Sequence, residues 1–266
     1  MAVTAVPEDW NSPVARNLGR LIALSDAGRR HLESLTSDII ELKPRRKLID
    51  ENRPSDQMFI VLSGWISEYR QLRDGGRQIL NFKLPGEVLG VECLLYKTAL
   101  HSAAAVTSCT IAPVSREMFE ETQRLFPRLA AAFLLSSLRD GAILQEWAVN
   151  LGRRPAFPRI AHLLLELERR LRIGGLATQV SIPFPLKQQD IADCTGLTTP
   201  YVNRVLQQMR NMGLIHLEEE SLEICDSLEL AKAAGFRPDY LQASAQTEWQ
   251  TAFRPEPRTI SLTAAA

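Results

Sequence analysis

The sequence has few cysteines and histidines, and they lie far apart. Its four cysteines and four histidines form no CxxC pair and no other ligand spacing: Cys93, Cys109, Cys194, Cys225, His31, His101, His162 and His216. Zinc sites draw on closely spaced Cys and His, so none is predicted. No cysteine cluster stands near the N-terminus to hold an iron–sulfur centre. We therefore expect a protein without a metal site.

The sequence also lacks long apolar runs and the common catalytic motifs. No run of about 18 apolar residues occurs, so no membrane-spanning helix is expected. The first residues have neither the basic segment nor the apolar core of a signal peptide. This predicts a cytoplasmic location, where the cysteines stay reduced. Because GxSxG, HExxH, P-loop and paired-carboxylate patterns are missing as well, we expect a protein that is not an enzyme.

An excess of positive charge, which favours binding to nucleic acids, is absent. Lys and Arg number 31, as do Asp and Glu, so the net charge is zero. Six arginines gather near the start of the C-terminal part: Arg153, Arg154, Arg159, Arg169, Arg170 and Arg172. Phosphates would repel the acidic run at residues 218–220. Either this turn stays away from a DNA backbone or the affinity is modest and strongly salt-sensitive. A simple solvated turn is the plainer interpretation of the glutamates.

Residues 185–217 have the pattern of two short helices joined by a sharp turn. Small apolar residues at helical spacing mark the first helix: Ile191, Ala192 and Thr195. Gly196 permits the bend, Thr198 is expected to cap the second helix through its hydroxyl, and Pro200 fits the first turn. The expected buried stripe is Val202, Val205, Leu206 and Met209. A strand follows Gly213, so the stretch predicts a helix-turn-helix with a β-hairpin wing.

The outward face of the second helix carries side chains that can read DNA. Arg204 is the first candidate for direct readout, because Arg can form two hydrogen bonds with guanine, and Thr199 and Asn203 come next. Gln207 lies on the same face and offers both a donor and an acceptor. Three residues are candidates for phosphate contacts: Thr198, Tyr201 and Gln189. The alternative is a helical hairpin in some other all-helical core, with Arg204 as a surface charge.

The N-terminal half has the pattern of an antiparallel sandwich or roll. The chain is long enough for two domains, and its 45% apolar and 23% charged residues are typical of globular proteins. Short strands alternate with turn residues between positions 39 and 114, and residues 73–76 (Arg-Asp-Gly-Gly) predict a hairpin. We place this domain at residues 18–124, after a flexible arm (1–17). Residues 244–266 have little periodicity and predict a mobile tail.

A long helix with two apolar stripes is expected over residues 125–152. One stripe follows a near-heptad: Leu129, Phe133, Ser136, Asp140, Ile143 and Trp147. The other lies on an adjoining face: Leu135, Leu138, Ala142 and Val149. One face can pack on the strands and the other on a second subunit, which predicts a homodimer. A helix buried in a single domain is the alternative. Residues 153–155 (Arg-Arg-Pro) would then be a hinge before a DNA-binding domain at 153–243.

This order of elements resembles the Crp/Fnr family of bacterial transcription regulators. The resemblance is carried by residues 59–64, 75–79, 84–90, 189–192, 196–198, 202–204 and 213–215. It implies an α+β fold with a β-roll sensor domain like those that bind cyclic nucleotides, a long dimerisation helix and a winged helix-turn-helix. It also implies a homodimer that binds a palindromic operator through Thr198–Met212 and recruits or blocks RNA polymerase. The family's base-reading arginine falls on Arg204, and the Thr-Thr-Pro-Tyr-Val-Asn-Arg version is similar to regulators of α-proteobacteria.

The expected effector pocket departs from the members of the family that bind cyclic AMP. Their Gly-Glu pair becomes Gly90-Val91, with Glu92 one place late, and their Arg-Ser pair becomes His101-Ser102. A neutral imidazole does not replace the arginine that grips the cyclic phosphate, so we expect little response to cyclic AMP. His101 could be a structural residue or a haem ligand. Packing is the plain interpretation of the cysteines, and the alternative function is a redox or haem sensor acting through protein contacts.

Overall fold

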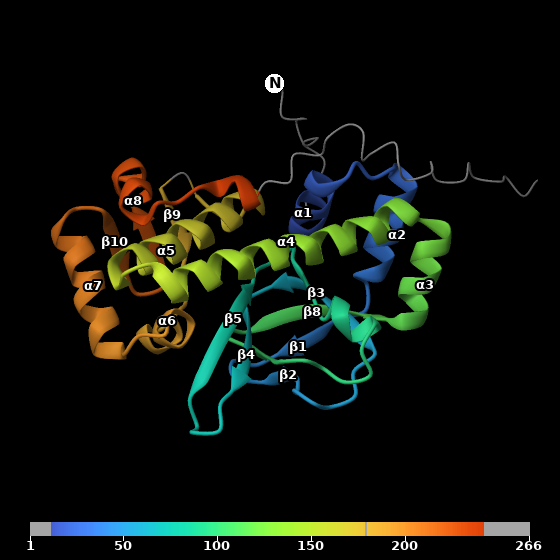
Figure 1. Cartoon of the computed structure of the whole chain (residues 1–266). Coiled ribbons are helices and arrows are strands. Elements are labelled where there is room, and N and C mark those ends of the chain that lie inside the picture. Colours follow the sequence, from blue (N-terminus) through green and yellow to red (C-terminus); the bar gives the residue numbers. More distant parts are fainter. Residues whose placement is uncertain (1–11, 179, 242–266) are drawn as a thin grey trace, which may run out of the picture.

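Two four-stranded antiparallel sheets form the N-terminal half of the molecule in the computed structural model, which describes residues 12–178 and 180–241 (Figure 1). The first sheet has the order β1 (Ile40–Leu42), β8 (Cys109–Ser115), β3 (Gln57–Ser63) and β6 (Val88–Leu89). The second has the order β2 (Lys47–Ile49), β7 (Ser102–Ala105), β4 (Ile66–Gln71) and β5 (Arg77–Lys83). The predicted hairpin joins β4 and β5, and Gly75 takes φ +86° at its tip. The predicted β-roll is confirmed.

Helices cover one side of the β-roll (Figure 1). They are α1 (Pro13–Leu21), α2 (Asp26–Leu35) and α3 (Arg116–Leu125), with a short 3-10 helix, η1 (Val91–Leu94), after β6. The structure differs from the flexible arm predicted for residues 1–17, because α1 begins at Pro13. Ser12 accepts a hydrogen bond from the Ala15 amide (3.2 Å), and Val14 and Leu18 are buried. A proline in the first turn of a helix looks in sequence like a loop residue. Residues 1–11 lie outside the described part.

The long helix α4 (Pro127–Arg153) runs across the whole molecule, from α3 to the C-terminal helices (Figure 1). Its first predicted stripe packs inward, with Leu129, Phe133, Ile143 and Trp147 buried. On the second stripe Leu138 and Val149 are exposed. The helix stops at the predicted Arg-Arg-Pro break, and α5 begins at Ala156.

Up to Leu241, the part of the C-terminal half that the structure describes contains five helices and a three-stranded sheet. The helices are α5 (Ala156–Ile173), α6 (Gln188–Thr195), α7 (Thr199–Asn211), α8 (Ser227–Ala234) and the 3-10 helix η2 (Pro238–Leu241). The sheet has the order β10 (Ile215–Glu218), β11 (Ser221–Ile224) and β9 (Ser181–Pro183). The predicted mobile tail, residues 244–266, lies outside the described residues.

One hydrophobic core continues from the β-roll into the C-terminal half. The ring of Trp65 lies 6.2 Å from that of Phe82, on β5, and 6.3 Å from that of Phe184, which follows β9. Trp147 of α4 packs against Phe82 at 6.3 Å. These four aromatic side chains are all buried. Because aromatic pairs bury large areas, the two halves are held together by an interior of the kind found within one domain.

A buried ion group reinforces this junction. Arg170 of α5 reaches Glu87, in the turn before β6, with 2.6 Å between its Nη2 and Oε2, and Glu166 at 3.2 Å. The indole of Trp147 donates to Glu166 at 3.0 Å. Burial would raise the pKa of Glu87, but the charges of Arg170 and Arg139 and the hydrogen bond from Arg170 lower it to about 2. Glu87 therefore stays ionised and binds α5 to the roll.

Candidate nucleic-acid interface

Helices α6 and α7 meet at the predicted sharp turn. Gly196 takes φ +64°, a left-handed conformation that glycine adopts at little cost, and α7 begins three residues later. Thr198 occupies the N-cap position, as predicted. Within the described residues, however, its hydroxyl caps no amide of α7, so that part of the prediction is wrong. The carbonyl oxygen of Thr198 instead accepts hydrogen bonds from the amides of Tyr201 (3.0 Å) and Val202 (2.9 Å).

The two faces of α7 differ sharply. The four apolar residues predicted to be inside are buried: Val202, Val205, Leu206 and Met209. Asn203, Arg204 and Gln207 are exposed on the other face. The guanidinium carbon of Arg204 lies 5.7 Å from the centre of the exposed Tyr201 ring, one helical turn away. Such a stack restrains the arginine without removing its hydrogen-bond donors.

The structure joins two candidate residues from different helices. The hydroxyl of Thr199, at the start of α7, donates to Oε1 of Gln189 on α6 (2.8 Å). The amide nitrogen of Gln189 donates in turn to Asp193 (2.6 Å). Sequence analysis missed Asp193, because an aspartate on α6 has no distinctive spacing. Thr199 and Gln189 therefore form one unit, whereas Thr198 is simply exposed.

The predicted wing is present next to α7. Strands β10 and β11 pair antiparallel, with Ile215 opposite Ile224 and Glu218 opposite Ser221. The three glutamates at the tip are exposed, and Glu219 takes φ +46° in the turn. Several of the clustered arginines bind partners within the protein and are therefore no open basic surface, among them Arg154, Arg159, Arg170 and Arg172.

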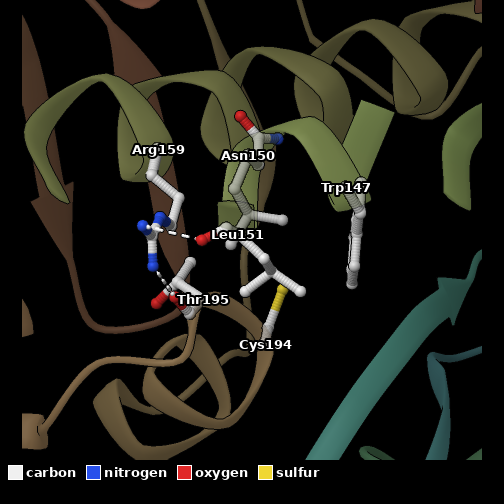
Figure 2. Close-up of a pocket in the computed structure, with 7 residues that line it drawn as sticks. Trp147, Asn150, Leu151, Arg159, Cys194 and Thr195 are labelled. Atoms are coloured by element: carbon white, nitrogen blue, oxygen red, sulfur yellow. Dashed lines mark hydrogen bonds between the residues drawn. The ribbon is translucent and has the colours of Figure 1, made fainter. Parts of the chain in front are cut away.

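A small pocket lies where α4, α5 and α6 meet (Figure 2). Arg159 donates to the carbonyl oxygens of Leu151, at the end of α4 (3.2 Å), and Thr195, at the end of α6 (2.6 Å). The sulfur of Cys194 points into the same pocket, toward Leu151 and Trp147 (Figure 2). Burial raises the pKa of the Cys194 thiol well above its usual value, so it is protonated and unreactive.

The predicted effector residues are only partly brought together. Nε2 of His101 lies 3.5 Å from Glu92. Glu92 belongs to η1, which begins directly after Gly90 (φ +76°). Ser102, on β7, instead accepts a hydrogen bond from the Glu51 amide (3.1 Å). Glu68 of β4 lies 3.3 Å from His101.

Charged residues missed by sequence analysis fill this part of the roll. Lys83 of β5 pairs with Asp140 of α4 and lies 3.8 Å from Glu68. Burial opposes charge here, yet the carboxylates of Glu68 and Glu92 keep the pKa of His101 above its usual value. Burial and the charge of Glu68 raise the pKa of Glu92. Nothing in the sequence indicates that charged residues on separate strands will lie next to each other in the fold. The cluster combines three acidic groups with one lysine and one histidine, which disfavours a cyclic phosphate.

The other cysteines give little support for a thiol switch. Cys93 and Cys109 are buried, and burial raises the pKa of both thiols. Cys225 is exposed, and burial together with Glu223 raises its pKa. Thiols with raised pKa values are mostly protonated at neutral pH and react slowly.

A β-roll followed by a long helix and a winged helix-turn-helix with an exposed polar recognition face defines a DNA-binding transcription regulator. Residues 39–124 match the cyclic nucleotide-binding domain, and residues 158–233 match the Crp-like helix-turn-helix domain. The nitrogen fixation regulation protein FixK of Rhizobium meliloti (strain 1021) is 34% identical over 179 residues, covering 66% of this chain and 77% of FixK. The chain belongs to the Crp/Fnr family of transcription regulators.

Two further comparisons agree with this assignment. The transcriptional activator protein anr of Pseudomonas aeruginosa is 27% identical over 207 residues, covering 77% of this chain and 84% of anr. The structure of FixK2 from Bradyrhizobium japonicum superposes with a TM-score of 0.68 at 25% identity, covering 75% of this chain and 98% of FixK2. These relatives are regulators, which confirms the prediction that the chain is not an enzyme. No described helix has the length and apolar character that crossing a membrane requires.

Proposed function

We propose that the protein is a cytoplasmic homodimer that binds an inverted-repeat operator with α7 and activates transcription together with RNA polymerase. The observation that carries this proposal is the polar face of α7, which stays exposed while its apolar face is buried. Activation follows the name of the anr protein of P. aeruginosa, a transcriptional activator. The sensor domain comprises residues 18–124, the dimerisation helix 125–152 and the DNA-binding domain 153–243.

Each exposed residue of the helix-turn-helix takes a role that follows from its chemistry. Arg204 reads a guanine in the major groove, and Asn203 and Thr199 contact neighbouring bases. Gln207, farther along α7, contributes at the edge of the site. Three residues bind the phosphate backbone and set the register: Thr198, Tyr201 and Gln189.

Dimerisation rests on the uncovered apolar stripe of α4. Leu134, Leu138 and Val149 are 50%, 70% and 45% exposed, and they lie four and eleven residues apart along one face. Such a stripe on a helix whose opposite side is already packed favours pairing with the same stripe of a second copy. A two-fold pair of α4 helices would hold two α7 helices about 34 Å apart, the repeat of the major groove.

The sensor domain works without cyclic AMP, either with no effector or with a different signal. Three observations support this. Lys83 is already paired with carboxylates, Glu68 and Glu92 would repel a phosphate, and the aromatic core fixes the roll on the DNA-binding domain. A haem-ligating imidazole has to be neutral, whereas the acidic neighbours of His101 favour the imidazolium. The buried cysteines likewise disfavour a redox sensor acting through protein contacts.

The experiment is in vitro selection of duplexes by the full chain, followed by titration of the enriched duplex. We expect an inverted repeat, two protein chains per duplex and an affinity that falls steeply as salt rises. Addition of cyclic AMP should leave the affinity unchanged. Failure to enrich any duplex at low salt, or a monomer on a single half-site, would contradict the proposal.

A further inference from the structure

A continuous path of polar contacts runs from the β-roll to the first residue of α7. It begins at Arg77, the first residue of β5, directly after the turn of the β4–β5 hairpin. Nε of Arg77 donates to Oδ2 of Asp193 on α6 (2.8 Å), and its Nη2 lies 2.7 Å from the same oxygen. Oδ1 of Asp193 accepts from Gln189 (2.6 Å), whose Oε1 accepts from the Thr199 hydroxyl (2.8 Å).

Arg77 is well placed to start this path. Its guanidinium carbon lies 5.5 Å from the centre of the Tyr69 ring on β4, and its side chain is 29% exposed. It also pairs with Asp190 at 3.0 Å, and the neighbouring Gln78 donates to the carbonyl oxygen of Cys194 (3.2 Å). The hairpin therefore grips α6 at several points, and Asp193 is held in a fixed position.

The chemistry of the groups fixes the direction of every hydrogen bond along the path. An arginine only donates and an ionised aspartate only accepts, so Gln189 must turn its NH₂ toward Asp193. Its carbonyl oxygen then faces Thr199, and the threonine hydroxyl must donate to it. What remains on Oγ1 of Thr199 are lone pairs, which can only accept. One N–H of Gln189 also stays available for a phosphate.

We propose that Arg77 is a positioning residue for DNA recognition, which fixes Thr199 as a hydrogen-bond acceptor through Asp193 and Gln189. The proposal rests on the proposed function of α7. Adenine and cytosine present amino groups in the major groove, whereas guanine and thymine present oxygen acceptors at the corresponding positions. Thr199 therefore selects adenine or cytosine on the strand it faces, although Arg77 itself contacts no base.

The test uses the full chain and duplexes that it enriches from a library with a randomised core. Selection with the Thr199→Ala variant identifies the base pair whose identity depends on Thr199. Affinities for the four versions of that base pair are then compared between the wild type and Arg77→Met, Arg77→Lys and Asp193→Asn. The matched control is Arg73→Met, because Arg73 is an exposed arginine at the tip of the same hairpin. Thermal unfolding of each variant verifies that it is folded.

We expect the wild type to prefer adenine or cytosine at that position about fivefold, the worth of a single hydrogen bond. In Arg77→Met and Asp193→Asn, the ratio of affinities for the preferred and the other bases should fall close to one. The preference at the base read by Arg204 should persist. Arg77→Lys should retain part of it and Arg73→Met all of it. In the Thr199→Ala background, Arg77→Met should change nothing further at this base pair.

Three results would overturn the inference while leaving the proposed function intact. They are a wild-type preference for guanine or thymine, an unchanged preference in Arg77→Met, and an equal loss of affinity for all four versions. A wild-type protein that enriches no duplex would overturn the proposed function first, and this inference with it.

Discussion

In the function proposed for α7, Arg204 is the residue on which sequence recognition depends most. It is exposed on α7 and stacks on Tyr201, so it reaches the groove partly ordered. We expect Arg204→Ala to weaken binding to the selected operator by about 1–3 kcal/mol and to relax base preference at one position. Fluorescence anisotropy with the operator and with its single-base variants measures both effects.

The control for the lost charge is Lys232→Ala, because Lys232 is an exposed cation on α8, away from α7 in the sequence. This variant should keep the full base preference. If Arg204→Ala lost the same affinity on random duplexes as on the operator, Arg204 would contact phosphate only.

Glu87 is the residue on which the junction between the two halves depends. Removing its charge leaves Arg170 buried with Glu166 as its remaining acidic partner. Loss of one partner of a buried ion pair costs about 3–5 kcal/mol. Urea unfolding of Glu87→Gln at neutral pH should show a loss in this range. Glu120→Gln, a change at an exposed glutamate of α3, should unfold like the wild type.

The pH dependence of this contribution has a definite sign. The pKa of Glu87 in the folded protein is about 2, below the value of about 4.3 for an unfolded glutamate. The stabilisation is therefore fully present above about pH 4.3 and is lost as the pH falls toward 2. Unfolding free energies of the wild type and Glu87→Gln should converge over this interval. A constant difference would mean that the carboxylate is not the source of the stability.

At the scale of elements, helix α4 has one packed side and one uncovered apolar stripe. One side is buried under the β-roll and α1, and the other exposes Leu134, Leu138 and Val149. Leu138→Glu places a charge on the most exposed of these positions, so we expect a folded monomer with far weaker operator binding. Sedimentation equilibrium measures the change in mass. Leu95→Glu alters a leucine that is 77% exposed on the roll and should remain a dimer.

Elements with local sequence signals could be predicted, and contacts between distant elements could not. The signals for α7 are local: Gly196, Pro200 and the apolar spacing each lie within a few residues of the turn or helix that they determine. The partners of Arg77 and Arg170 lie 116 and 83 residues away, and nothing in their local sequence names them. The start of helix α1 was missed for a related reason: Pro13 begins a helix because Val14 and Leu18 have a surface to pack on.

The same limit applies within the candidate site. The exposed face of α7 followed from helical periodicity, because the buried stripe determines what remains outside. The failure of Thr198 to cap, and the engagement of Thr199 by Gln189, depend on where α6 brings its side chains. The acidic filling of the effector site depends on β4, β5, η1 and α4 meeting, which no single stretch of sequence encodes.

At the scale of the whole molecule, the proposed dimer with its two recognition helices requires a fixed spacing of half-sites. Because the aromatic core and the Glu87–Arg170 pair hold the DNA-binding domain on the roll, the proposed dimer would have little freedom to adjust this spacing. Inserting about five base pairs between half-sites turns one of them to the opposite side of the duplex. We expect affinity to fall to that of a single half-site. An insertion of about ten base pairs leaves both half-sites on the same side of the duplex. It therefore tests whether the distance between the half-sites, rather than their relative orientation, limits binding.

The continuous interior also bears on whether the C-terminal half is a portable module. Cut away at Pro155, it would turn outward the apolar side of α5 and Phe184, which Trp65, Phe82 and Trp147 now cover. Such a fragment would tend to self-associate or to lose stable packing. Fusing it to another sensor domain would require new side chains that cover its exposed apolar side. The outward residues of α7 can therefore be exchanged between related proteins more easily than the whole C-terminal half.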